Sequence, residues 1–313
     1  MCGRHTPKAE TILDIIEHLK APEPQISGVV ANEPIDEEEV WERAIRQNRR
    51  LKQKEQRKKE QVIAFERGPV CIVNFADLHC GNEGVDYERI DRELDIVLST
   101  PGMYAGFIGD LLDNFIIGKL ARLEMHSSFK ITEEWAMVKR ITKKAAPKML
   151  WSVSGNHDYW TVMTSGIDYF REVHASLPQR VLYDDTEINV DMVVGAHTYK
   201  WRLRHKWKGS SIYNDTHAVE RAAKFDKGKH FDIGVMAHTH TSGLARQFNN
   251  GGKTGLAIIC GAYKRYDKFA NQVGFPQANE QCAVAIVLDD QGGMTTFSNL
   301  ETAAAYMRVI YGH

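Results

Sequence analysis

Several apolar runs of this chain end directly in aspartate, asparagine or histidine. The clearest covers residues 149–154 and is followed by Gly155, Asn156, His157 and Asp158. These polar residues suit a hydrophobic core poorly, although an ordinary polar turn would also explain them. The pattern recurs, because predicted strands at 70–75, 103–108 and 231–237 run into Asp77 with His79, Gly109 with Asp110, and His238 with His240.

Segments with helical spacing alternate with these runs. Apolar residues at 87–98 and 131–141 recur every three or four positions, as they do in an amphipathic helix. The order of strand, polar loop and helix predicts an α/β sheet whose loops gather at one edge. The second half is richer in strands, which we expect at 62–65, 181–183, 188–194, 199–203, 243–248, 256–261, 283–288 and 294–297, with helices at 216–225 and 300–310.

The residue types after the strands favour a metal site. Carboxylates, imidazoles and one neutral amide, without thiolates, suit Mn²⁺, Fe or Zn²⁺ and argue against a structural zinc site or an iron–sulfur cluster. The donors are too many for one tetrahedral ion, whereas two ions about 3.5–4 Å apart that share a carboxylate would use them all. The candidate ligands are Asp77, His79, Asp110, Asn156, His205, His238 and His240.

The series Asp-x-His, Gly-Asp, Gly-Asn-His-Asp, a later His and His-x-His resembles the calcineurin-like metallophosphoesterase superfamily, including its repair-nuclease and phage types, over roughly residues 70–240. The resemblance implies an α/β fold, an αββα four-layer sandwich at 62–313 that follows a short helical N-terminal extension at 1–61. It assigns one ion to Asp77, His79, Asp110 and His240. It assigns the other to Asp110, Asn156, His205 and His238, so that Asp110 bridges the two.

By the same resemblance, His157 and Asp158 are the catalytic residues that do not bind metal. His157 would lie beside the substrate phosphate and protonate the leaving oxygen or stabilise the transition state, while Asp158 would hold its ring. The two divalent ions would be Mn²⁺ first, with Fe, Zn²⁺, Mg²⁺ or Ni²⁺ as alternatives. They would generate a metal-bound hydroxide near neutral pH and neutralise the phosphoryl oxygens.

Two residues depart from the family's pattern. Ala237 stands where glycine usually precedes the last His-x-His, but it keeps a small side chain at that position. Cys80 follows His79 where an apolar residue is usual, and we interpret it as a small buried hydrophobic residue.

The middle histidine ligand has three candidates, His197, His205 and His217. We prefer His205 because it follows a predicted strand and precedes the polar segment 206–210, which resembles the turn after this ligand in the family. The sequence leaves the other two open.

The N-terminal sixty residues predict helices. Thr6 and Pro7 begin one that extends to about residue 19, and Asp36 begins a second with an apolar face at Val40, Trp41, Ala44 and Ile45. From Arg46 to Lys59 basic residues replace that face. This basic segment could follow phosphates, but a solvated linker helix is the commoner explanation, and a helix-turn-helix lacks a turn signature here.

Three features bear on the substrate: the basic segment, the cluster at 206–208, and residues 261–268, where tyrosines alternate with basic residues. Rings interleaved with cations suit a nucleic acid or nucleotide, although all three could be solvated surface or packing beneath the site. We therefore predict a hydrolase, most simply a phosphodiesterase or nuclease on DNA or nucleotides. A phosphomonoesterase acting on proteins or small molecules is the first alternative, and a non-catalytic scaffold the second.

The composition limits the cellular compartment and the partners that we expect for this protein. A formal net charge of -1 over 313 residues gives no bulk attraction to a polyelectrolyte, so any nucleic-acid contact must be local. The five cysteines are odd in number and lack metal-type close pairs, which indicates reduced thiols. The sequence has neither an apolar signal core nor a bilayer-length apolar run. We expect a cytoplasmic protein without a membrane partner.

Overall fold

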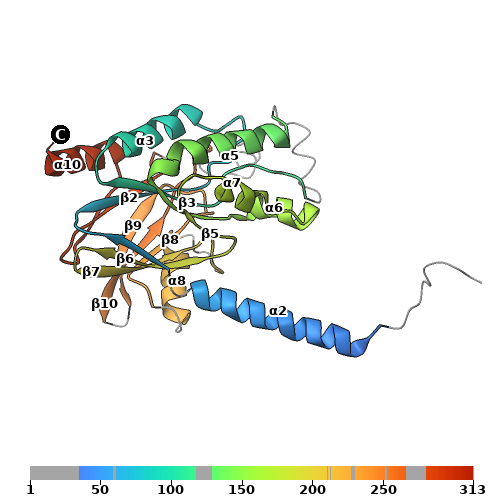
Figure 1. Cartoon of the computed structure of the whole chain (residues 1–313). Coiled ribbons are helices and arrows are strands. Elements are labelled where there is room, and N and C mark those ends of the chain that lie inside the picture. The colour runs from blue at the N-terminus through green and yellow to red at the C-terminus, as the bar shows by residue number, and fades with distance from the viewer. Residues whose placement is uncertain are drawn as a thin grey trace, which may run out of the picture. The chain divides into compact units, whose positions relative to one another are not determined.

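The computed structural model (Figure 1) describes residues 35–58, 61–117, 129–209, 211, 213–226, 230–250, 252–265 and 280–312. The first predicted helix, residue Lys59 of the basic segment and residues 266–268 lie outside the described residues. The chain divides into two compact units, Met1–Lys52 and Gln53–His313. The domain boundary expected at residues 61–62 stays a prediction.

Helix α2 (Glu37–Lys58) is the N-terminal helix that the sequence predicts. Asp36 caps it, because its carboxylate accepts a hydrogen bond from the backbone N–H of Glu39 at 3.1 Å. The apolar residues expected on one face are present but exposed, with Trp41 66% accessible. No described helix is long and apolar enough to cross a membrane.

The second unit contains two six-stranded sheets. The β3 sheet has the order β12-β11-β2-β3-β4-β5. Its strands are β2 (Val70–Phe75), β3 (Met103–Ile108), β4 (Met149–Val153), β5 (Leu182–Asp184), β11 (Val284–Leu288) and β12 (Met294–Phe297). The β7 sheet has the order β1-β6-β7-β8-β10-β9. Its strands are β1 (Val62–Phe65), β6 (Ile188–Val194), β7 (His197–Leu203), β8 (Ile233–Met236), β9 (Leu244–Asn250) and β10 (Lys253–Ile259).

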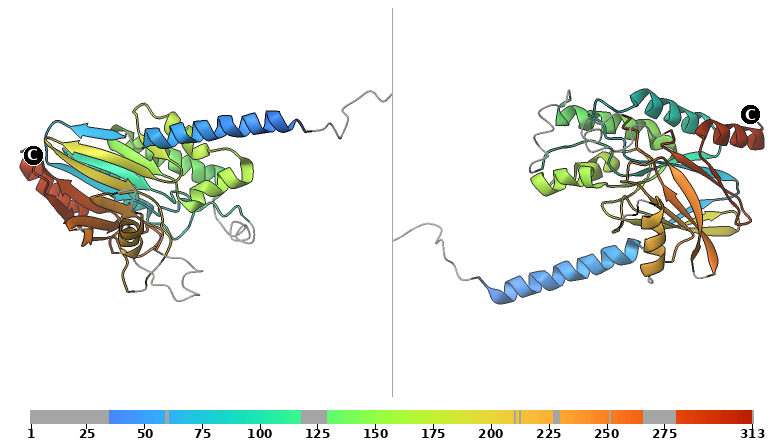
Figure 2. Two further views of the ribbon diagram at one scale, coloured as in Figure 1. Left: turned by 90° about the horizontal axis from the view of Figure 1, so that it is seen from below. Right: turned by 180° about the vertical axis from the view of Figure 1, so that it is seen from behind.

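Three apolar clusters define four layers (Figure 2). One cluster fills the space between the β3 sheet and α3 (Tyr87–Ser99), α5 (Ile131–Ala145), α7 (Tyr169–Ala175) and α10 (Leu300–Tyr311). A second lies between the sheets, where the rings of Trp151 and Trp201 are 5.1 Å apart. A third joins α8 (His217–Phe225) to the β7 sheet. The αββα four-layer sandwich is therefore confirmed.

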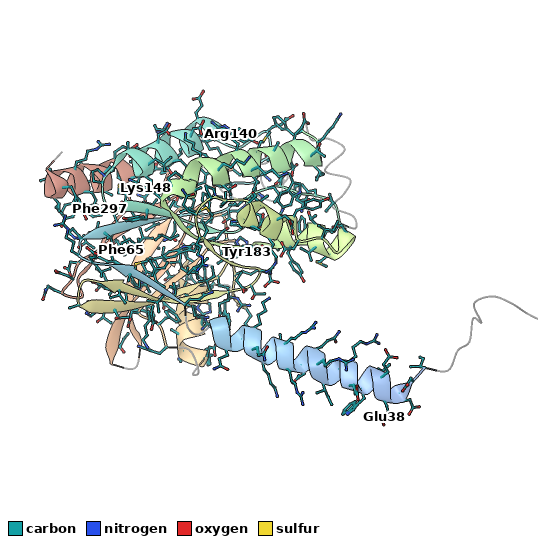
Figure 3. All side chains as sticks on the ribbon, viewed as in Figure 1. Glu38, Phe65, Arg140, Lys148, Tyr183 and Phe297 are labelled. Atoms are coloured by element: carbon teal, nitrogen blue, oxygen red, sulfur yellow. The ribbon has the colours of Figure 1, made fainter. Side chains whose placement is uncertain are left out.

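The outer helices of the β3 sheet are tied together by polar contacts. Arg140 of α5 forms an ion pair with Asp91 of α3 at 2.7 Å, and Lys148 donates to the carbonyl of Thr100 at 2.6 Å (Figure 3). These contacts hold the helix layer over a sheet whose central strand β2 is buried at every position. Burial on both faces explains why β2 shows no alternation of polar and apolar residues.

The strand register places the loops of the candidate site. Strands β2, β3 and β4 are parallel neighbours, with Phe75 opposite Phe107 and Ile108 opposite Val153. Since each strand ends at or next to these pairs, the loops that follow start at the same edge of the sheet. The predicted strands and helices agree with these elements to within a few residues at their ends.

The segment after Gly155 differs from the prediction, because it forms α6 (Asn156–Ser165) rather than a loop. Gly155 is the N-cap, and Asn156, His157 and Asp158 form the first turn. Only Asp158 and Thr161 of this helix are buried. No apolar stripe therefore marks α6 in the sequence.

Candidate metal centre

The loops after β2 and β3 are joined by backbone hydrogen bonds. The N–H of Asp77 donates to the carbonyl of Gly109 at 3.0 Å, and the N–H of His79 donates to that of Asp110 at 3.1 Å. The N–H of His238, which follows β8, donates to the Asp77 carboxylate at 2.9 Å. Three loops far apart in the sequence thus meet at one edge.

One group of candidate ligands consists of Asp77, His79 and His240, whose donor atoms lie within 4.8 Å of one another. The Nε2 atoms of the two histidines are 3.0 Å apart. Oδ1 of Asp77 lies 3.6 Å from Nε2 of His240 and 3.9 Å from Nε2 of His79. These are the three side chains that, with Asp110, were expected to hold the first ion.

A second group consists of Asp110, His205 and His238, again with donor atoms within 4.8 Å of one another. Nε2 of His205 lies 3.0 Å from Oδ2 of Asp110 and 3.9 Å from Oδ1 of Asp77. The two groups are therefore adjacent. Asn156, the remaining predicted ligand, begins α6 directly after Gly155.

The geometry separates His205 from the two other candidate histidines. His205 is buried, and its Nδ1 donates to the carbonyl of Ile108 at 2.7 Å, which leaves Nε2 facing the carboxylates. His197 begins β7 and its ring packs against Tyr199, while His217 begins α8. Of the three, the structure brings His205 to Asp110.

Four of the candidate ligands each have a buried polar atom that the described residues do not satisfy. Among the described residues, the atoms without a hydrogen-bond partner include Oδ1 of Asp77, Oδ2 of Asp110, Oδ1 of Asn156 and Nε2 of His205. The 3.0 Å contact between Asp110 and His205 lacks hydrogen-bond geometry. A buried polar atom left without a partner costs about 1–3 kcal/mol, so native proteins seldom keep several together. Bound cations would accept these lone pairs, and the donor set therefore fits divalent metal ions.

Backbone strain is concentrated at the same residues. Non-glycine residues with positive φ include Asp77 at 48°, His79 at 47°, Asp110 at 52°, His238 at 76° and His240 at 53°. Such conformations cost of order 1–3 kcal/mol each and persist only where the surrounding structure imposes them. Their coincidence with the predicted ligands is consistent with this edge being the candidate functional site.

Gly155 permits the close approach of the third loop. A Cβ atom at Gly155 would lie 2.0 Å from Oδ1 of Asp110 and 2.3 Å from its backbone nitrogen. Any side chain there would displace Asp110 from the centre. The glycine in Gly-Asn-His-Asp is thus required for packing rather than for backbone conformation.

Asp158 does not hold the ring of His157, and that prediction is wrong. Its carboxylate accepts hydrogen bonds from the backbone N–H groups of Asp110 at 2.8 Å, Leu111 at 2.9 Å and Gly155 at 2.7 Å. Burial, and then the neighbouring Asp110 carboxylate, raise the pKa of Asp158. Asp158 instead fastens the loop after β3 to the start of α6.

The ring of His157 is held by a backbone carbonyl. Its Nδ1 donates to the oxygen of Asp113, and its Nε2 lies 4.0 Å from Oδ2 of Asp110. Burial lowers the pKa of His157 to about 4, against the opposing charge of Asp110. The neutral ring therefore directs an unprotonated Nε2 toward the centre.

Asp113 is a site residue to which the sequence assigned no role. One of its oxygens lies 2.9 Å from Nδ1 of His79, and the other accepts from the side-chain amide of Asn82 at 2.9 Å. Burial would raise the pKa of Asp113, but the hydrogen bond and charge of His79, with the charge of Lys264, lower it to about 2. A second aspartate three residues after Asp110 was the signal that could have found it.

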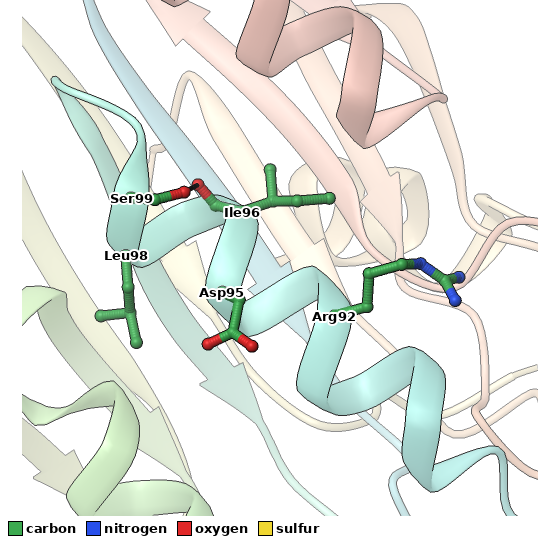
Figure 4. A pocket seen from close by; sticks show the side chains of 5 residues that line it. All are labelled: Arg92, Asp95, Ile96, Leu98 and Ser99. Carbon is green, nitrogen blue, oxygen red and sulfur yellow. Dashed lines mark hydrogen bonds between the residues drawn. The ribbon is translucent and has the colours of Figure 1, made fainter.

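Two aromatic residues of the predicted substrate features already pack against other side chains. Tyr263 is fully buried and its hydroxyl donates to Glu93. The ring of Trp207 is covered by the guanidinium groups of Arg202 and Arg204, each 4.8 Å from its centroid. A shallow depression on α3 is lined by none of the candidate ligands, but by Arg92, Asp95, Ile96, Leu98 and Ser99 (Figure 4).

No family model matches the chain, and no curated protein matches its sequence. Among solved structures, a metallophosphoesterase from Sphaerobacter thermophilus is 16% identical, with a TM-score of 0.36 and coverage of 78% of this chain and 95% of that one. The nuclease MPE of Pseudomonas putida is 14% identical, with a TM-score of 0.33 and coverage of 72% and 87%. Vps29 of Chaetomium thermophilum is 11% identical, with a TM-score of 0.34 and coverage of 72% and 94%. The structure has the paired six-stranded sheets, enclosed by helices and with an Asp/His cluster at one edge, that the sequence predicts.

Proposed function

We propose that this protein is a metal-dependent phosphoesterase that binds two divalent ions, with a phosphodiester such as DNA or a nucleotide as its first expected substrate. The observation that carries the proposal is that four candidate ligands, Asp77, Asp110, Asn156 and His205, each have a buried atom without a hydrogen-bond partner among the described residues. Ions bound there would supply a water nucleophile near neutral pH and offset phosphoryl charge.

Residues around the candidate ligands orient them. The Asp113 carboxylate holds the His79 ring, and the Ile108 carbonyl holds the His205 ring. These bonds fix the rings so that each Nε2 faces the candidate ligands. The ligand set itself is part of the proposal: Asp77, His79, Asp110 and His240 for one ion, and Asp110, Asn156, His205 and His238 for the other.

His157 is proposed to handle the proton of the leaving oxygen. Its Nδ1 is committed to the Asp113 carbonyl, so only Nε2, 4.0 Å from Asp110, is free to exchange a proton at the centre. Burial disfavours the charged ring, and a bound phosphate would supply the negative charge that favours it. A proton held at Nε2 could then pass to the leaving oxygen.

A phosphomonoesterase is the second candidate, because two lysines flank the centre. Lys264 is buried with its Nζ 3.6 Å from Oδ1 of Asp113, and Lys206 follows His205, where its charge acts on His238. Two cations would suit the extra negative charge of a monoester.

Metal analysis combined with a substrate screen tests the proposal. Full-length protein purified without chelator is expected to hold up to two divalent ions per chain. It is also expected to hydrolyse bis-p-nitrophenyl phosphate or DNA when Mn²⁺ is added. If the protein hydrolyses p-nitrophenyl phosphate but neither bis-p-nitrophenyl phosphate nor DNA, its substrate is a phosphomonoester rather than a phosphodiester. Less than one ion per chain together with no Mn²⁺-stimulated hydrolysis would instead favour a non-catalytic scaffold.

A further inference from the structure

Two aromatic rings border His157 and take no part in the candidate metal centre. The ring centroid of Trp160 lies 4.0 Å from that of His157, with the planes inclined at 33°. The Phe115 ring lies 5.3 Å from His157 and 5.9 Å from Trp160. Both aromatic residues are half-buried, so each keeps some accessible surface.

The two rings belong to different segments that polar contacts lock together. The side-chain amide of Asn114, which precedes Phe115, donates to the carbonyl of His157 and to Oγ1 of Thr161, the latter at 3.0 Å. The N–H of Asn114 donates to Glu134 of α5 at 2.9 Å, and its φ of +48° shows that the surroundings impose this conformation. The positions of Phe115 and Trp160 are therefore set before any ligand arrives.

The charges around the rings indicate which group they would accept. Helix α6, which carries Trp160, has no lysine or arginine. The ammonium group of Lys264 lies 5.8 Å from the Phe115 centroid, and it is paired with the Asp113 carboxylate at 3.6 Å. A substrate that places its phosphate at the candidate metal centre could therefore place an uncharged ring against the apolar surface of Phe115 and Trp160.

We propose that Phe115 and Trp160 form a subsite for a planar aromatic ring on the leaving-group side of the phosphate ester. The inference rests on the proposed function, in which His157 gives its proton to the leaving oxygen. Rings that touch His157 therefore lie on the leaving-group side of the phosphate. Aromatic side chains stack on every nucleobase, so the subsite favours nucleotides and aryl esters over alkyl phosphates without reading base identity.

Equilibrium binding to the full chain tests the subsite. Isothermal titration calorimetry with Mn²⁺ present compares AMP with ribose 5-phosphate, which keeps the sugar and phosphate but lacks the ring. AMP is expected to bind about tenfold more tightly. Phenyl phosphate and propyl phosphate repeat the comparison for aryl esters. Tighter binding of AMP than of ribose 5-phosphate, without a difference between phenyl and propyl phosphate, assigns the subsite to nucleotides. Tighter binding of phenyl than of propyl phosphate alone assigns it to aryl esters. Either result supports the subsite.

Two substitutions at Trp160 separate the effect of the aromatic ring from the effect of apolar volume. Trp160→Leu keeps apolar volume against His157 but removes the aromatic face, and it is expected to bring the AMP to ribose 5-phosphate ratio close to one. Trp160→Phe should keep most of the preference. Tyr159→Ala removes the neighbouring ring, which is exposed and makes no ring contact with His157, and it should leave the ratio unchanged. Inorganic phosphate should bind all four proteins equally.

Equal affinity within both pairs of ligands in the unmodified protein would overturn the subsite, as would a preference that survives Trp160→Leu. Failure of the proposed function looks different. In that case Mn²⁺ and inorganic phosphate would not bind, and Mn²⁺-stimulated hydrolysis would be absent.

Discussion

Asp110 connects the loops of the candidate metal centre. Its Oδ1 accepts from the N–H of His157 at 2.8 Å, its Oδ2 lies 3.0 Å from His205, and its N–H donates to Asp158. Burial would raise the pKa of Asp110, but interaction with the neighbouring His205 outweighs burial and lowers it well below its usual value. A buried, ionised carboxylate in this position requires compensating positive charge.

Substitutions at Asp110 and His157 should have separable effects. Asp110→Ala is expected to release bound Mn²⁺ and abolish turnover, because it removes the side chain shared by both proposed ions. His157→Ala should retain Mn²⁺ while turnover falls by about 10²–10⁴-fold, the usual contribution of general acid–base catalysis. Metal analysis after gel filtration, together with hydrolysis rates, measures both effects.

The alternative at this scale is that His157 is itself a ligand. His79, Asp113 and His157 also have donor atoms within 4.8 Å of one another. Loss of metal from His157→Ala equal to that from Asp110→Ala would assign His157 to this group and remove its proposed role in proton transfer.

At the scale of elements, helix α7 carries a buried histidine that is remote in sequence from the candidate ligands. Nδ1 of His174 donates to the carbonyl of Phe170 at 2.7 Å, and its ring stacks on Tyr183 with centroids 4.8 Å apart. Burial lowers the pKa of His174 below its usual value, although the nearby Asp168 opposes this. The helix is therefore packed around a neutral imidazole.

This packing predicts that the free energy of unfolding decreases as the pH falls. When the folded pKa of a histidine is lowered, the unfolded chain binds more protons near and below pH 6.5, so stability falls as the pH decreases through that range. His174→Phe should therefore lose less free energy of unfolding between pH 7 and pH 5 than the unmodified protein. Urea denaturation at both pH values measures the difference.

A histidine on the surface serves as the control. His230 is 43% exposed, and His230→Gln is the matched variant, because it replaces a histidine that lies outside α7 and its packed ring contacts. An unchanged pH dependence in His174→Phe would mean that His174 titrates as it does in the unfolded chain.

At the scale of the whole molecule, metal binding should couple to stability. The β3 sheet carries strained, buried and partly unpartnered ligands at the ends of β2 and β3. A ligand that binds only the folded state at 100 times its dissociation constant stabilises the fold by about 2.7 kcal/mol. Adding Mn²⁺ should thus raise Tm, and a chelator should lower it.

Differential scanning calorimetry checks this coupling. The rise in Tm should increase with Mn²⁺ concentration and should be absent in Asp110→Ala. An equal rise in that variant would show that Mn²⁺ stabilises the protein elsewhere.

The sequence by itself determined the strands of the β3 sheet and the polar residues that follow them. Runs such as those of β2 and β3 are recognised from neighbouring residues alone, and parallel strands bring their ends to one edge in any α/β sheet. The candidate ligands could therefore be predicted from local pattern combined with a family resemblance. The same reasoning missed α6, because only Asp158 and Thr161 of that helix are buried.

Only the tertiary structure decided which side chains meet. Asp158 contacts the backbone of Asp110, 48 residues away, and so it cannot hold the ring beside it in the sequence. His205 was separated from two other histidines by its contact with the Ile108 carbonyl, 97 residues away. Hydrogen bonds between distant residues depend on strand register and loop conformation, which local periodicity does not encode. For that reason the sequence could name the residues of this centre, but their partners became known only from the fold.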